Sequence, residues 1–120
     1  IKKYNNQNIF ESLVDYILFL KQAQKTNNDL IPTYFEQIID GMVYELYFPE
    51  LLQQHNRTII EHLGELPAFT DTMNDAQKMQ IINTVFERLN EKSHPVRVNL
   101  FYMNSIPEIA IIEGKKEESL

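Results

Sequence analysis

Apolar residues recur at three- and four-residue spacing along most of the chain, a pattern that predicts amphipathic helices. The first helix is expected from Ile9 to about Lys25, and the second from about Pro32 to Gln54. Pro49 should interrupt the second helix, because proline lacks a backbone donor and clashes with the preceding turn. The main apolar stripe of this second helix consists of Phe35, Ile38, Ile39, Met42, Val43 and Leu46.

Capping signals divide the second half of the chain into shorter predicted helices. The segments "TIIE" at 58–61 and "NDAQ" at 74–77 have the form of capping boxes, and "SIPE" at 105–108 should cap a last short helix. The alternation in 96–103 would allow a strand, but no partner strand is evident, so a helix is expected there. The prediction is an all-α fold: an irregular bundle of five to seven helices in a single domain over residues 1–120.

The segment "IIDGMVYELYF" at 38–48 is apolar around most of its helical circumference, which is typical of a central helix in a bundle. Tyr44, Tyr47 and Phe48 lie to one side of the main stripe. Core packing is the ordinary explanation for these aromatic side chains, and docking onto another domain is the alternative. Asp40 lies beside Tyr44 and could bond to a tyrosine or a helix cap. The glycine of this segment weakens a helix by up to about 1 kcal/mol relative to alanine, so a close helix crossing or chance must account for it.

The composition restricts the classes of function. The chain has 11 Lys and Arg against 17 Asp and Glu, for a net charge of −6, which disfavours general binding to nucleic-acid phosphates or anionic membranes. It has no cysteine, which excludes disulfides and thiolate metal sites and fits the reducing cytoplasm. No stretch approaches the roughly 20 apolar residues of a membrane helix. Because the chain begins with Ile1 and not with Met, we expect it to be a fragment of a longer protein.

No catalytic, cofactor-binding or metal site is predicted. Glu36 and Asp40 lie four residues apart, but no histidine joins them at metal-ligand spacing, so a solvated helix face is expected. The three histidines match no metal pattern, and His94 should simply cap a helix before Pro95. The "EGK" at 113–115 resembles the end of a nuclease site, but a helix end offers no adjacent strand. A modest DNA-contacting patch could be formed by the basic residues Lys78, Arg88, Lys92 and Arg97.

Two segments resemble a known family. "IDGMVYELYF" at 39–48 is similar to the I-D-x-x-V-Y-x-L-Y segment near the C-terminus of many bacterial adenine-specific DNA methyltransferases, including type IIG enzymes that join methylation and restriction in one chain. "PEIAIIE" at 107–113 resembles the E-I-x-x-I-E ending of such enzymes, displaced here by inserted helices. "LVDYILFLKQ" at 13–22 also resembles the segment that leads into the first motif. Together these matches cover about half of the chain.

The resemblance implies a context for the chain and not a reaction. The family's catalytic motif, N-P-P followed by Tyr, Phe or Trp, is missing, and so is its glycine-containing cofactor motif. We therefore expect S-adenosylmethionine and DNA to bind the parent enzyme, while this fragment is a non-catalytic scaffold or docking module for the other domains. The matched residues should be structural; they are Asp40, Val43, Tyr44, Leu46 and Tyr47. Two alternatives stay open: an independent protein-interaction adaptor using Tyr44, Tyr47 and Phe48, or a weak DNA-binding helical module.

Overall fold

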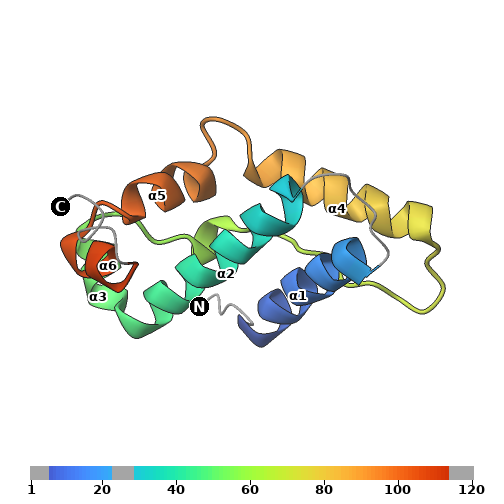
Figure 1. Cartoon of the computed structure of the whole chain (residues 1–120), viewed down its shortest axis with the longest axis horizontal. Coiled ribbons are helices and arrows are strands. Elements are labelled where there is room, and N and C mark those ends of the chain that lie inside the picture. The colour runs from blue at the N-terminus through green and yellow to red at the C-terminus, as the bar shows by residue number, and fades with distance from the viewer. Residues whose placement is uncertain (1–5, 23–28, 114–120) are drawn as a thin grey trace.

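Residues 6–22 and 29–113 are described by the computed structural model, and their regular structure is entirely helical (Figure 1). The α-helices are α1 (Asn6–Gln22), α2 (Leu30–Tyr47), α3 (Pro49–Gln54), α4 (Asp75–Leu89), α5 (Pro95–Met103) and α6 (Pro107–Ile112), and one 3-10 turn, η1, spans Ile60–His62. This arrangement confirms the predicted all-α bundle of five to seven helices. The expected extension of the first helix to Lys25 lies outside the described residues.

Helix α2 lies at the centre of the fold. It runs antiparallel to α1, while α5, α3 and α6 gather around its C-terminal half (Figure 1). The connection from α3 to α4 passes α1, where the Ser12 and Tyr16 hydroxyls donate to the backbone carbonyls of Leu66 and Pro67. The fully buried side chains at the centre of the core include Leu13, Tyr16, Leu20, Phe35, Ile38, Met42, Leu52, Ile59, Leu63, Ile82, Leu89, Val96 and Ile109.

Three local predictions are confirmed. Pro49 separates α2 from α3 and is the first residue of α3. The ambiguous segment after the His-Pro pair is helix α5, and His94 Nδ1 accepts from a backbone amide of its first turn at 3.1 Å. Helix α4 begins with a reciprocal capping box, in which the side chains of Asn74 and Gln77 each accept from the other residue's backbone amide at 2.8 Å.

The predicted capping box at Thr58 is wrong. The Thr58 hydroxyl donates to Glu61 Oε1, and only the single turn η1 follows. The amides of Ile59 and Ile60 donate instead to Glu45 Oε1 on α2, at 2.6 and 3.0 Å. An ionised carboxylate is a stronger acceptor than a hydroxyl, so this long-range bond takes the place of the local cap.

The predicted cap at Ser105 is also wrong. Its hydroxyl donates backward to the carbonyl of Tyr102 at 2.6 Å. Helix α6 still begins where expected, because Pro107 occupies its first turn, where a missing amide hydrogen carries no penalty.

The apolar stripe of α2 is buried along only part of its length. Phe35, Ile38 and Met42 are fully buried, whereas Leu46 is 45% exposed near the end of the helix. Gly41 lies where α2 packs against α5, and a Cβ atom there would be 2.6 Å from Leu100 Cδ2. A close helix crossing therefore accounts for the glycine.

Candidate functional site

A groove of about 620 Å³ runs between α2 and α5 and reaches the end of α6. We call it the α2–α5 groove. Residues that share one face of α2 form one wall, since positions three, four and seven apart align on a helix. The groove is lined by Leu30, Thr33, Tyr34, Gln37, Asp40, Gly41, Tyr44, Asn90, Arg97, Leu100, Phe101, Met103, Asn104 and Glu113.

One end of the α2–α5 groove is acidic. The Tyr44 hydroxyl donates to the Glu113 carboxylate at the end of α6. Partial desolvation raises the pKa of Asp40, and the negative charges of Glu113 and Glu36 raise it further. Burial also raises the pKa of Tyr44, as do its hydrogen bond to Glu113 and the charges of Glu113 and Asp40. Two carboxylates and a tyrosine hydroxyl therefore share this end of the groove, and the field there is negative.

The other end of the groove is held by backbone contacts. Tyr34 is buried, and its hydroxyl donates to the carbonyl of Leu89 at 2.6 Å. Burial raises the pKa of Tyr34 to about 12, while the charge of Arg97 acts in the opposite direction. Arg97 in turn donates to the carbonyl of Asn90 at 2.7 Å. This end is structurally fixed and carries the positive charge of the lining.

The aromatic residues predicted to form one docking face do not lie together. Tyr47 is 77% exposed at the end of α2, whereas Phe48 is half-buried and packs against the core. Tyr44 faces the α2–α5 groove together with Asp40. Phe101 of α5 lines the same groove and is 74% exposed. The groove is therefore lined by Tyr44 from the predicted docking residues and by Phe101, which the sequence pattern had not indicated.

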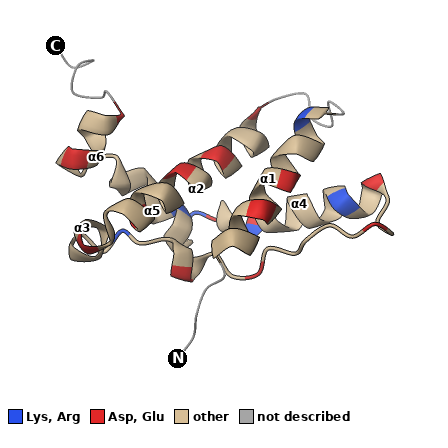
Figure 2. Cartoon of the chain, turned by 90° about the horizontal axis from the view of Figure 1, so that it is seen from below, with Lys and Arg blue, Asp and Glu red and all other residues tan. Residues whose placement is uncertain are grey.

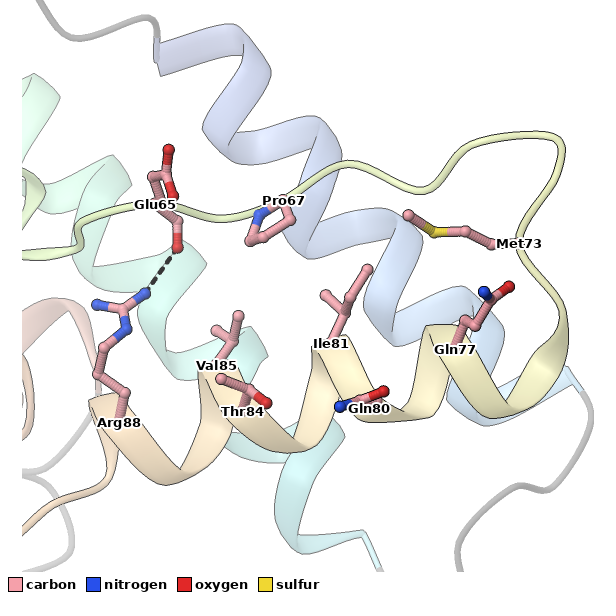
Figure 3. Close-up of a pocket in the computed structure, with 9 residues that line it drawn as sticks. All are labelled: Glu65, Pro67, Met73, Gln77, Gln80, Ile81, Thr84, Val85 and Arg88. Carbon is pink, nitrogen blue, oxygen red and sulfur yellow. Dashed lines mark hydrogen bonds between the residues drawn. The ribbon is translucent and has the colours of Figure 1, made fainter.

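A second groove of about 440 Å³ lies between α4 and the segment 65–73 (Figure 3). Its lining consists of Glu65, Pro67, Met73, Gln77, Gln80, Ile81, Thr84, Val85 and Arg88. Ile81 and Val85 rise from α4 toward Pro67, so the floor is apolar (Figure 3). The Glu65 carboxylate points away from the groove (Figure 3). This groove can offer apolar contact and amide hydrogen bonds, but it has no acid–base pair.

Arg88 at the end of this second groove holds the neighbouring turn. Its guanidinium donates to the carbonyls of Leu63 and Glu65, both at 2.7 Å. Gly64 between them has a φ of +69°, and a Cβ there would lie 2.7 Å from Arg88 Nη1. Only glycine meets both conditions readily, since L side chains seldom adopt positive φ.

Figure 2 shows basic residues on several separate elements, and the four considered for DNA contact come from α4, α5 and the connection between them. Arg88 and Arg97 donate to backbone carbonyls, and Lys78 lies over two phenylalanine rings, 5.6 and 5.3 Å from their centroids. Lys92 is exposed. Ten residues separate Lys78 from Arg88, or about 15 Å of helix. DNA binding by this set stays a prediction, and two of its members already have structural roles.

Sequence reasoning missed several polar residues with long-range roles. Asn99 is 8% exposed; its side chain accepts from Arg57 and donates to the carbonyl of Thr58. Glu45 Oε1 accepts from the backbone amides of Ile59 and Ile60 and so caps η1. Glu113 carried a signal only through two short resemblances, as the last residue of "PEIAIIE" and the first of "EGK". Nothing in the sequence pattern marked Asn99 or Glu45, because their partners are remote in the chain.

The described part of the chain holds neither a metal-binding cluster nor a helix that could cross a membrane. Among these residues, no group of three or more His, Cys, Asp or Glu side chains could hold a metal ion. None of the described helices combines the length and apolar character needed to cross a bilayer. Comparisons of the chain with protein-family models, curated proteins and solved structures give no match.

Proposed function

We propose that this chain is a non-catalytic helical docking module of a DNA restriction–modification methyltransferase. One observation carries the proposal: the two segments that resemble the family meet in space. Tyr44 of "IDGMVYELYF" donates to Glu113 of "PEIAIIE" across 69 positions of sequence. A contact between two motif segments is expected if both belong to one structural unit of the family.

The exposed apolar side chains support a docking role. Most of the large ones lie toward the α2–α5–α6 end, namely Leu46, Tyr47, Phe101, Tyr102, Ile111 and Ile112. Clusters of exposed apolar residues commonly mark interaction sites. In this proposal that end contacts the other domains of the parent enzyme. Those domains supply S-adenosylmethionine binding, methyl transfer and DNA contact in the cytoplasm.

The first test is the parent reading frame. It should contain, upstream of Ile1, the motif N-P-P followed by Tyr, Phe or Trp. A frame without that motif would refute the methyltransferase assignment.

The second test separates the chain from the rest of that frame. The two parts, produced as differently tagged polypeptides, should co-purify as a one-to-one complex. Replacing the exposed aromatic residues, in a Tyr47→Ser/Phe101→Ser variant, should weaken the complex. A matched control is Leu18→Ser, which changes an apolar residue that is 56% exposed on α1, remote from the proposed surface. Equal weakening by both variants would count against docking through this end.

The adaptor alternative has some support of its own. It required Tyr44, Tyr47 and Phe48 to be exposed. Tyr47 is 77% exposed, whereas Tyr44 and Phe48 are half-buried. The reading frame separates the two proposals, because an adaptor would stand without a methyltransferase motif upstream.

A further inference from the structure

The geometry points to a specific occupant for the α2–α5 groove: an amphipathic helical segment of another polypeptide. We infer that this segment places a Lys or Arg side chain between Asp40 and Glu113 and apolar side chains over Leu100 and Phe101. The inference rests on the proposed docking role and specifies the chemistry of the partner.

The shape of the groove fits a helix. Its α2 wall extends from Leu30 past Tyr34 and Gly41 to Tyr44. At 1.5 Å per residue, the 14 positions from Leu30 to Tyr44 span about 21 Å, which matches a partner helix of about 14 residues. Two packed helices present a channel into which the apolar face of a third can lie, a common mode of peptide recognition.

The charges of the groove select a basic partner. No described residue forms a hydrogen bond or ion pair with the Asp40 carboxylate, and the negative charges of Glu36 and Glu113 act on it. Arg97 is the basic residue of the lining, and it already donates to a backbone carbonyl near Tyr34. A cation at Asp40 and Glu113 would relieve their repulsion and form charge-assisted hydrogen bonds.

The exposed apolar side chains of the groove favour a polypeptide partner over a small cation. Phe101 is 74% exposed, and Leu30 at the opposite end is 60% exposed. Leu100 is half-buried and lines the wall between the two helices. An ammonium ion or polyamine would leave these side chains in water, whereas aliphatic side chains of a partner helix would cover them. Large aromatic side chains commonly act as anchors in such interfaces.

The test is a titration of the full chain with a synthetic helical peptide. The probe is a fluorescein-labelled amphipathic peptide with leucines on one face and arginines on the other, followed by fluorescence anisotropy. The reference probe has the same leucines, with every arginine replaced by glutamine. We expect the arginine peptide to bind at least about tenfold more tightly, as complementary charges at close range can provide.

Variants locate the binding. Asp40→Asn/Glu113→Gln should weaken the arginine peptide about tenfold, and Phe101→Ala should weaken both peptides, since it removes an apolar anchor. The control Glu50→Gln/Glu87→Gln removes the same amount of charge from two exposed acids elsewhere and should change binding less than about twofold. No binding, equal affinity for the two peptides, or equal effects of the two charge variants would overturn the inference.

This titration uses only the present chain. It can fail while the parent frame still contains the methyltransferase motif, and it can succeed in a frame that lacks the motif. Failure of the inference and failure of the proposed function are therefore distinguishable.

Discussion

The two sides of helix α2 are built differently. Toward α1 and α4, Phe35 is fully buried and its ring lies 5.6 Å from that of Tyr16 and 6.4 Å from that of Phe86. Toward α5 and α6, the same helix faces a groove with exposed Phe101 and the Asp40 carboxylate. On the first side, the apolar side chains are buried and the hydroxyls are hydrogen-bonded within the chain. On the second side, the Phe101 ring and the Asp40 carboxylate are exposed and available to a partner.

One apolar helix can therefore stabilise the fold on one side and offer a binding surface on the other. The buried Tyr16 hydroxyl donates to the backbone carbonyl of Pro67, which helps to fix the closed side. Burial raises the pKa of Tyr16, so this hydroxyl keeps its proton as a donor. On the open side, the Tyr44 hydroxyl donates to the exposed carboxylate of Glu113. Stability should depend on the first set of residues and recognition on the second.

The largest expected effect is on the closed side. Phe35→Ala should lower the free energy of unfolding by about 3–5 kcal/mol, because it removes a ring from the centre of the core. Phe101→Ala removes the same ring from the surface and should change stability by less than about 0.5 kcal/mol. Urea unfolding followed by circular dichroism measures both. Similar losses in the two variants would contradict the division of α2 into two sides.

A smaller effect is expected where Arg88 holds the turn at Gly64. Arg88→Met keeps much of the apolar stem but removes two hydrogen bonds to carbonyls, and it should lower stability by about 1–3 kcal/mol. Limited proteolysis should then cut the segment 65–73 faster. Lys92→Met is the control, since it removes the same charge from an exposed residue. If the two variants were equally stable, the structural role of Arg88 would be wrong.

The next effect concerns the boundary between the two sides. In an open helix, Gly→Ala stabilises by up to about 1 kcal/mol. Gly41→Ala should instead destabilise by about 1–2 kcal/mol, because the added methyl would overpack against Leu100 and Ile59. Adding Leu100→Ala should relieve part of this strain, and a double-mutant cycle would show the coupling. A stabilising Gly41→Ala would mean that the crossing is looser than described.

The smallest effect has the opposite sign and lies in the groove. The raised pKa of Asp40 means that its ionised form is penalised in the folded state, so the penalty is present at neutral pH. It disappears as pH falls through the raised pKa and is gone below the ordinary value of 3.8. Asp40→Asn should therefore stabilise by about 0.5 kcal/mol or less at pH 7, since the group is solvent-screened. The gain over wild type should vanish at low pH; a gain that grows on acidification would contradict the assignment.

The fold could be predicted where its signals are local. The cap at Asn74 and the break at Pro49 depend on residues within one helical turn, so the sequence pattern was sufficient for both. The box at Thr58 had the same spacing as the one at Asn74 and was wrong, because Glu45 on another helix bonds to the amides. Two segments with the same capping spacing can therefore differ in whether the capping box forms, and contacts with a remote helix determine which one does.

The groove could be predicted only in part. Asp40 and Tyr44 share a helix face, and the expected bond was from Asp40 to a tyrosine or a helix cap. The Tyr44 hydroxyl donates instead to Glu113. Glu113 could not be placed beside them, because it is 69 positions from Tyr44 and depends on how α6 packs. Phe101 lies in a segment whose pattern allowed a strand or a helix, so its exposure followed only from the fold.

The most direct test of the division of α2 is an NMR titration of the ¹⁵N-labelled chain with the arginine peptide. Amide shifts should be concentrated at Asp40, Tyr44, Leu100, Phe101 and Glu113. The amides of Tyr16, Phe69 and Arg88, on the closed side, should stay unchanged. Shifts centred on α1 or on the groove beside α4, or none at saturating peptide, would contradict the account.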